Sequence, residues 1–254
     1  MPFCVVKSRT IKIFFAMVVV AVLLALSIEG GAAAQVWFGY SSRLVPVYRV
    51  ETQEKQVAIS FDAAWGADKT EEILEVLNEY QAGATFFLVG FWVDKYPEMV
   101  KAIDEAGIEI GTHSNTHPDM AKISTENIAK ELDISIEKIK AITGKEVSLF
   151  RPPYGSYNND LINACSERNL IPIQWDVDSL DWKGLSSVDV TKRVMEKVQS
   201  GSIILMHNNA DNVVESTRMV LERLTKEGYK VTSVGDLVYK SNYTIDRNGV
   251  QHSN

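Results

Sequence analysis

Short apolar runs alternate with longer amphipathic stretches along most of this chain, and no other feature constrains the fold as strongly. Seven runs have the length and the β-branched or aromatic content of buried strands: residues 57–61, 84–89, 108–112, 148–150, 171–175, 203–206 and 230–234. An alternation of strands and helices is typical of a mostly parallel sheet. We therefore expect an α/β fold, a distorted (β/α) barrel of about seven β-α units.

The stretches between these runs carry the signals of helices. Ser124 precedes a long amphipathic run that Gly144 ends, as a helix cap and a helix stop would. Two later runs, 187–199 and 213–227, also end shortly before a glycine. The whole pattern suits one domain with a single large core.

The first 34 residues are set apart by their charge and hydropathy. Residues 11–28 are almost wholly apolar, and basic side chains precede them. Small residues then end in an A-x-A pattern at Ala34, which is typical of a cleavable signal peptide. The stretch also reaches the minimum of about 17 residues for a transmembrane helix, so a membrane anchor that is not cleaved is an equally good interpretation. Both interpretations place the remaining chain outside the cytoplasm, as a membrane-anchored or a secreted protein.

The rest of the chain divides by composition. Residues 35–55 are expected to form a tether, residues 56–239 the folded domain, and residues 240–254, with His252, a polar tail. The net charge of −7 argues against a nucleic-acid partner, because phosphate binding requires an excess of Lys and Arg. The two cysteines lie on opposite sides of the hydrophobic segment, so no intrachain disulfide is expected.

Polar and aromatic residues gather directly after the predicted strands. In parallel α/β folds the loops at the carboxyl ends of the strands form the active face. Five such ends are rich in these residues: 60–66, 112–117, 151–155, 176–182 and 205–207. Three of the four histidines occur in them, which favours a functional site over chance.

The candidate catalytic groups are two histidines, an aspartate and a third histidine. His113 and His117 are four residues apart, so on one helical turn both imidazoles could bind a single divalent ion. Asp62 could accept a proton from a metal-bound water. His207 is a candidate proton donor, because imidazole titrates nearest neutrality. The alternatives are ordinary surface or core histidines and a turn or helix-capping aspartate.

Arg151 and the aromatic residues of these loops suggest how a substrate is held. The two prolines after Arg151 favour an extended backbone, which would let its guanidinium orient a carboxylate such as Asp62 or Asp178. The alternative is a surface arginine on a rigid turn. Aromatic rings beside hydrogen-bonding groups suit the faces of pyranose sugars, although aromatic residues are more often part of a core. Three of them occur in these loops: Trp65, Tyr154 and Trp182.

The five segments, in this order, resemble the polysaccharide deacetylase family, the NodB-homology domain of carbohydrate esterase family four. The resemblance covers residues 56–239. It implies a distorted (β/α) barrel that binds a divalent metal, usually zinc. It also implies hydrolysis of the N-acetyl groups of chitin-like polymers or peptidoglycan.

The resemblance assigns roles to the first three motifs. Asp62 matches the catalytic base, and Arg151 matches the residue that positions this base. His113 and His117 match the metal-binding histidines. The backbone N–H near Tyr154 would join the metal as an oxyanion donor.

The last two motifs receive roles in the same way. Asp178 and Asp181, with Trp182, match the segment that forms one wall of the substrate groove and tunes the acid. Leu205 would line the pocket for the acetyl methyl group. His207 would protonate the departing amine.

One position departs from the family pattern. The second aspartate of the family, the third protein ligand of the metal, is Ala63 here. Metal affinity should fall unless waters, Asp68 or another carboxylate substitutes. The variant pattern Phe-Asp-x-x-Trp-Gly, with one N-terminal hydrophobic segment, resembles the sporulation-type deacetylases of spore-forming bacteria. Peptidoglycan of the spore envelope is then the expected substrate.

Three functions remain open at this point. The first is an active metal-dependent deacetylase. The second, which Ala63 supports, is a catalytically weak or inactive barrel that binds glycan or scaffolds spore-wall assembly. The third is a glycosidase, which requires two carboxylates at a glycosidic bond and leaves the histidine pair without a role.

Overall fold

The computed structural model describes three stretches of the chain: residues 12–20, 22 and 43–254. They belong to two units, residues 1–43 and 44–254, and residues 12–20 and 22 of the first unit are helical. The rest of the apolar stretch 11–28, and the cleavage position expected near Ala34, lie outside the described residues. Within the described part of the chain, no helix combines the length and apolar character that crossing a membrane requires.

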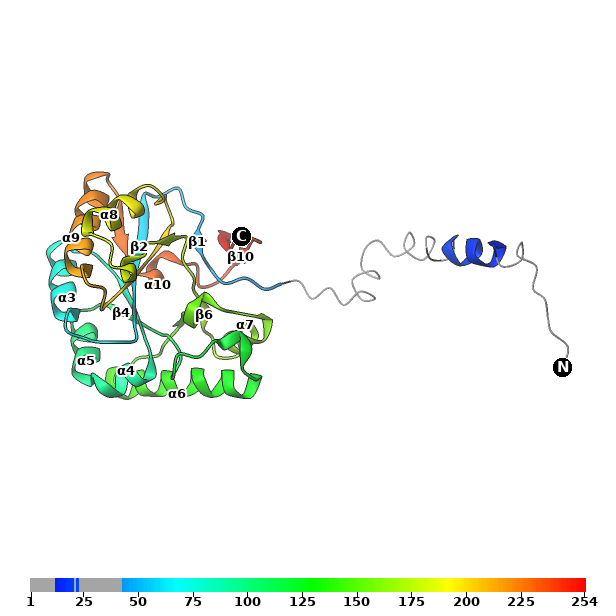
Figure 1. Cartoon of the computed structure of the whole chain (residues 1–254), viewed down its shortest axis with the longest axis horizontal. Helices are drawn as coiled ribbons and strands as arrows, with labels where there is room; N and C mark the ends of the chain where they lie inside the picture. Colours follow the sequence, from blue (N-terminus) through cyan, green and yellow to red (C-terminus); the bar gives the residue numbers. More distant parts are fainter. Residues whose placement is uncertain (1–11, 21, 23–42) are drawn as a thin grey trace. The chain divides into compact units, whose positions relative to one another are not determined.

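The second unit is built on an eight-stranded sheet (Figure 1). Seven strands follow one another in the order β6 (Ile171–Pro172), β5 (Leu149–Phe150), β4 (Glu109–Thr112), β3 (Thr85–Leu88), β2 (Gln56–Ala63), β8 (Ile203–His207) and β7 (Val177–Asp178). The eighth strand, β9 (Lys230–Thr232), also pairs with β2. Every pairing in the sheet is parallel, so the expected α/β fold is confirmed.

Helices follow most of the strands and pack on the outside of the curled sheet (Figure 1). Their bounds are α3 Thr70–Glu79, α4 Gly90–Lys95, α5 Pro97–Glu105, α6 Thr125–Thr143, α7 Asn159–Ser166, α8 Ser187–Met195, α9 Val213–Lys226 and α10 Val234–Leu237. The caps predicted for the longest helix are confirmed. The Ser124 side chain accepts a hydrogen bond from the Asn127 N–H, and Gly144 ends α6 in the left-handed conformation.

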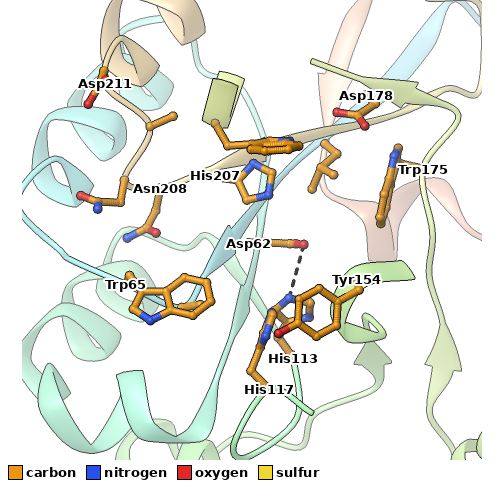
Figure 2. Close-up of a pocket in the computed structure, with 15 residues that line it drawn as sticks. Asp62, Trp65, His113, His117, Tyr154, Trp175, Asp178, His207, Asn208 and Asp211 are labelled. Carbon is orange, nitrogen blue, oxygen red and sulfur yellow. Dashed lines mark ion pairs between the residues drawn. The ribbon is translucent and has the colours of Figure 1, made fainter. Parts of the chain in front are cut away.

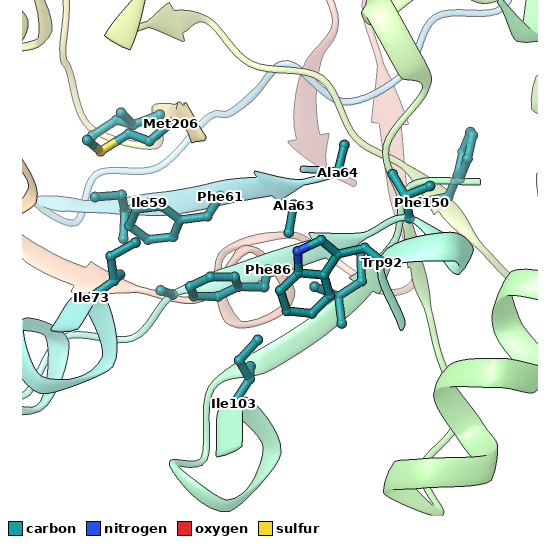
Figure 3. Close-up of a cluster of buried hydrophobic side chains, with 14 of the residues drawn as sticks. Ile59, Phe61, Ala63, Ala64, Ile73, Phe86, Trp92, Ile103, Phe150 and Met206 are labelled. Atoms are coloured by element: carbon teal, nitrogen blue, oxygen red, sulfur yellow. The ribbon is translucent and has the colours of Figure 1, made fainter. Parts of the chain in front are cut away.

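The two faces of β2 serve different purposes. Alternate residues, from Val57 through Ile59 and Phe61 to Ala63, belong to the core between the sheet and its helices (Figure 3). Phe61 stacks on Phe86 with ring centroids 4.9 Å apart. Each fully buried Phe or Ile side chain contributes roughly 1.5–3 kcal/mol. This core holds β2 rigidly, and β2 carries Asp62 on its other face.

One predicted strand is shorter in the structure, and an unpredicted strand follows it. The run 171–175 was expected to form a single strand, but β6 ends at Pro172 and a separate short strand, β7, begins at Val177. Between them, the Asp176 carboxylate accepts hydrogen bonds from the Ser202 hydroxyl and the Ile203 N–H. The two-residue strand Val177–Asp178 is too short for any periodic pattern to predict.

The compact unit extends beyond residues 56–239 on both sides. The strand β1 (Arg49–Val50) and a hairpin of β10 (Tyr243–Ile245) and β11 (Val250–Ser253) form a three-stranded sheet. Val47 and Val50 are buried, and the Val50 N–H donates to the Gly201 carbonyl. His252, expected in a polar tail, lies 2.7 Å from the Glu51 carboxylate. The sequence did not predict this packing, because single buried valines within polar segments form no recognisable strand pattern.

Gly201 tests how tightly the β1 segment is docked. It has a φ of +81°, and a Cβ there would lie 1.8 Å from the Val50 carbonyl oxygen. Gly228 has a similar φ of +80°, but a Cβ there would meet nothing within 4 Å. We expect Gly228→Ala to lose about 1–2 kcal/mol of unfolding free energy, and Gly201→Ala to lose about 1–3 kcal/mol more. Equal losses in urea unfolding would contradict the docking.

Candidate active site

A cavity of about 640 Å³ opens at the carboxyl ends of the strands (Figure 2). Nine of the residues predicted from the sequence line it: Asp62, Trp65, His113, His117, Tyr154, Asp178, Trp182, Leu205 and His207. Two others, Arg151 and Asp181, are buried behind this lining and hold lining residues in place. The structure thus brings together all eleven predicted residues, from loops more than 140 positions apart in the sequence.

The Arg151 guanidinium lies under the cavity floor. Its Nη1 donates to Asp62 Oδ1 at 2.9 Å and to the Ser60 hydroxyl at 2.8 Å, and its Nη2 donates to the Gln174 carbonyl at 3.1 Å. The guanidinium also lies over the Phe87 ring, 4.2 Å from its centroid. With a side chain 0% exposed, Arg151 is no surface arginine, so that alternative is wrong.

This pairing sets the charge of Asp62. Burial by itself would raise the pKa of the carboxyl group, but the Arg151 guanidinium, with smaller effects from His113 and His207, brings the pKa below its usual value. Asp62 is therefore an anion at neutral pH. Its second oxygen, Oδ2, is 3.5 Å from Nε2 of His113 and faces the cavity.

The two histidines of the second motif lie side by side. Their ring centroids are 4.9 Å apart and the rings are nearly perpendicular. Nδ1 of His113 is 2.7 Å from the Arg151 carbonyl oxygen, and because a carbonyl only accepts, this nitrogen carries the proton. In the neutral ring the lone pair of Nε2 then points toward Asp62.

A loop, and not the expected helical turn, brings the histidines together. The strand β4 ends at Thr112, and Ser114 and His117 both have positive φ values, 68° and 60°. The Ser114 hydroxyl accepts a hydrogen bond from the His117 N–H. Left-handed conformations at non-glycine residues cost energy and persist only where the surroundings impose them.

The helix α6 imposes this conformation through polar residues that the sequence analysis missed. Glu131 accepts hydrogen bonds from the N–H groups of Asn115 and Thr116, at 2.8 and 2.7 Å. One turn further on, the Ser135 hydroxyl bonds with the Thr112 hydroxyl. Lys138 then donates to the Asn115 side chain. In the sequence these residues are typical of a solvent-exposed helix face, so no signal distinguished them.

Both imidazoles are held neutral. Burial lowers the pKa of His113, although the Asp62 carboxylate opposes this effect. Burial, with a smaller effect of His113, lowers the pKa of His117 to about 4. The His117 Nδ1 is buried and has no hydrogen-bond partner. Neutral imidazoles are the form in which histidine binds a metal.

The donor set for a metal is nevertheless incomplete. Catalytic zinc sites normally use three protein ligands. Ala63, at the position of the family's third ligand, is 0% exposed and lies in the core on the opposite side of β2 from Asp62. Among the described residues, no group of three His, Cys, Asp or Glu side chains could hold a metal ion. The residues present therefore do not make up a complete zinc site.

A second charged pair lies beside Asp62, at the end of the neighbouring strand β8. His207 Nδ1 is 2.8 Å from Asp181 Oδ1, and the His207 backbone N–H donates to Asp181 Oδ2. Burial would lower the pKa of His207, but the hydrogen bond and the charge of Asp181 raise it above its usual value. Asp178 lines the same wall, and its Oδ1 accepts a hydrogen bond from the Leu180 N–H.

Three exposed aromatic residues surround the cavity mouth. Trp65, Tyr154 and Trp182 are 62%, 70% and 58% exposed, so none of them belongs to the core. Trp65 and Tyr154 both meet the His117 ring edge to face. Further lining residues were not predicted from the sequence: Trp175, Asn208, Asn209 and Asp211. In the sequence, only their position next to a predicted strand end could have indicated that they line the cavity.

Known proteins match this arrangement. The family model described as polysaccharide deacetylase matches residues 49–171. A Bacillus cereus relative named peptidoglycan-N-acetylglucosamine deacetylase is 31% identical over 196 residues, which cover 75% of this chain and 92% of the relative. This chain belongs to the polysaccharide deacetylase family, and several of its relatives are named peptidoglycan deacetylases.

Other matches involve longer proteins and solved structures. The uncharacterized protein YlxY of Bacillus subtilis is 34% identical over 193 residues, 76% of this chain and 60% of YlxY. The chain spans 40 to 62% of the length of three such curated relatives. The structure of a CE4 family pseudoenzyme from Bacillus anthracis is similar with a TM-score of 0.75 at 32% identity, covering 83% of this chain and 73% of that one. This likeness confirms the distorted barrel.

Replacing Arg151 should expose the dependence of the site on its buried ion pair. Arg151→Met leaves the Asp62 carboxylate buried without its main partner, which costs about 3–5 kcal/mol of unfolding free energy. The matched control Arg168→Met breaks a partly exposed pair with Asp133, for which we expect about 0–1 kcal/mol. Chemical denaturation measures both. Equal losses would show that the buried pair has no special importance for stability.

Proposed function

We propose that this chain removes acetyl groups from an amino-sugar polymer of the cell wall. One observation carries the proposal: the Asp62 anion and the His207–Asp181 pair line the same cavity from the neighbouring strands β2 and β8, where Asp62 and His207 are in register. Two titratable groups whose environments move their pKa values apart are the usual sign of a base and an acid acting on one substrate. The family relationship supplies the reaction, hydrolysis of an N-acetyl amide.

The reaction requires a base that can activate water. Asp62 accepts a proton from a water molecule, whose oxygen attacks the acetyl carbonyl carbon. Arg151 keeps Asp62 ionised and oriented throughout. The backbone N–H of Tyr154, held at a φ of 59°, donates to the oxyanion, as the family resemblance implies.

The second half of the reaction requires an acid. Protonated His207, stabilised by Asp181, gives its proton to the sugar nitrogen as the carbon–nitrogen bond breaks. The products are acetate and a free amine on the sugar. Leu205, at the cavity wall, lies beside the acetyl methyl group, while Asp178 and Trp182 form the groove wall.

Zinc would supply electrostatic activation of the acetyl carbonyl, but it would find only the two imidazoles as protein ligands. We therefore propose weak metal binding and a reduced rate compared with a family member that has all three ligands. No step above depends on the metal.

The substrate we propose is peptidoglycan, at its N-acetylglucosamine or N-acetylmuramic acid residues. Relatives named for peptidoglycan deacetylation support this choice. The exposed rings of Trp65, Tyr154 and Trp182 offer flat apolar faces for pyranose rings. Such a substrate requires an extracytoplasmic protein, anchored by residues 11–28 or secreted, and the envelope of the forespore is the location we propose.

A second function has specific support. Ala63 faces away from the cavity, and one of the similar structures is that of a CE4 family pseudoenzyme. The alternative is a catalytically weak or inactive barrel that binds glycan or scaffolds spore-wall assembly. Glycan binding without acetate release would favour it. Production of new reducing ends without acetate would instead indicate a glycosidase.

Asp62→Asn tests the proposed base. Asparagine has nearly the same shape but cannot accept the proton, so release of acetate from an N-acetylglucosamine oligomer should fall by about 100-fold or more. Asp160→Asn, an exposed position in the first turn of α7, is the matched control and should leave the rate unchanged. The base assignment is rejected if both variants release acetate at the native rate.

The pH dependence of the reaction tests the proposed acid. Because Asp181 raises the pKa of His207, Asp181→Asn should leave burial to lower it. His207 would then lose its proton at lower pH, and the alkaline limb of kcat/KM should move to lower pH. Asp160→Asn serves as the control again. A profile of Asp181→Asn that superimposes on the native profile would falsify the assignment of His207 as the acid.

A further inference from the structure

The charge of the cavity lining limits which sugars the site can accept. In the part of the chain that the structure describes, three carboxylates line the cavity, Asp62, Asp178 and Asp211, and no lysine or arginine does (Figure 2). Asp62 is the proposed base and Asp178 belongs to the proposed groove wall. Asp211 takes no part in the proposed reaction, so its charge is free to act on the choice of substrate.

A short, firmly held loop places Asp211 beside the cavity. The loop follows β8 directly, and the Ala210 N–H donates to the His207 carbonyl at 3.3 Å. The Lys69 ammonium donates to the backbone carbonyl oxygens of Ala210 and Asp211, at 2.8 and 2.9 Å. The Asp211 side chain is exposed, and its carboxylate has no hydrogen bond or ion pair with another described residue. The loop therefore fixes an unpaired negative charge close to the proposed acid.

The cationic groups of the reaction already have partners. The Arg151 guanidinium is 0% exposed beneath the cavity floor and pairs with Asp62. A protonated His207 is balanced by Asp181, whose Oδ1 lies 2.8 Å from its Nδ1. Neither cation is left to neutralise an acidic group on the substrate.

Two further basic residues lie around the groove wall but outside the cavity lining. The Arg193 guanidinium donates to the backbone carbonyl of Asp178, at 2.7 Å. The Lys183 ammonium lies over the Trp182 ring, 5.1 Å from its centroid. A negatively charged group inside the cavity would thus meet fixed carboxylates and no cation of the lining.

The two amino sugars of peptidoglycan differ in charge close to the reacting group. Both carry an acetamido group, but N-acetylmuramic acid also carries a lactyl ether, which ends in a carboxyl group, on the adjacent ring carbon. A sugar bound with its acetyl group at Asp62 therefore brings this carboxyl group to the same cavity. A free lactyl carboxylate there is an unpaired charge among like charges, which is unfavourable.

We propose that this site selects N-acetylglucosamine and rejects N-acetylmuramic acid whose lactyl carboxyl group is free, and that Asp211 is the residue that sets this choice. The inference rests on the proposed deacetylation and specifies its substrate. A binding site can discriminate by placing an unpaired charge against the wrong ligand. The neutral N-acetylglucosamine meets the same lining without this penalty.

Two tetrasaccharides that differ in charge but hardly in size test the proposal. Both alternate N-acetylglucosamine with N-acetylmuramic acid, and in one of them every lactyl carboxyl group is converted to its methylamide. We expect the full native chain to remove acetyl groups from the muramic acid residues of the free-acid form about 10-fold more slowly, measured as kcat/KM. Mass spectrometry locates the sugars that react. Salt at about 0.5 M should narrow the difference, because it screens exposed charges.

Charge reversal at Asp211 identifies the residue responsible. Asp211→Lys should reduce the difference between the two tetrasaccharides by about 5-fold or more, because it exchanges a like charge for an opposite one. Asp160→Lys makes the same change in net charge at an exposed position of α7 and is the matched control. It should leave the difference as it is in the native chain.

Equal rates on the two tetrasaccharides would overturn the proposal, as would equal effects of Asp211→Lys and Asp160→Lys. If neither tetrasaccharide releases acetate, calorimetry of binding decides. Weaker binding of the free-acid form, relieved by Asp211→Lys, would support the charge selection and count against the proposed function alone. Absence of both binding and acetate release would overturn the two together.

Discussion

The buried contact between Arg151 and Asp62 is the interaction on which the rest of the site depends. The guanidinium joins β2 to the Gln174 backbone, and the Arg151 carbonyl holds the proton of His113 on Nδ1. One residue thus sets the charge of the base, the tautomer of a histidine and the spacing between them. A buried pair is seldom a net gain in stability, so its value lies in geometry.

The cavity is lined by two neighbouring ionisable groups, Asp62 on β2 and His207 on β8, whose pKa values are moved in opposite directions. Asp62 stays ionised because the Arg151 guanidinium lies behind it and lowers its pKa. Asp181 lies behind His207 and raises the pKa of the imidazole. In both cases the group behind is buried and the group in front reaches the cavity. This arrangement suits the transfer of one proton from water and of another to a leaving amine. The position of the family's third metal ligand is occupied by Ala63, which cannot bind a metal.

Much of the site was predictable, because parallel strands bring their carboxyl ends to one edge. Asp62, His113 and His207 each follow an apolar run, and this alone predicted that they would meet. The role of Glu131 was not predictable, since a glutamate on an amphipathic helix is usually solvated. The docking of β1 and of the hairpin β10–β11 was also missed, because buried residues such as Val47 and Val250 are isolated in polar flanks.

The sequence by itself determined the parallel α/β architecture, the residues at the strand ends and the absence of a second acidic residue after Asp62. Only the tertiary structure decided which way each of those residues faces. The period of a strand is two, so one residue more or less of regular strand exchanges the cavity face for the core face. Hydrogen bonds between neighbouring strands decide how far β2 continues, and they keep Ala63 on the core face, opposite Asp62.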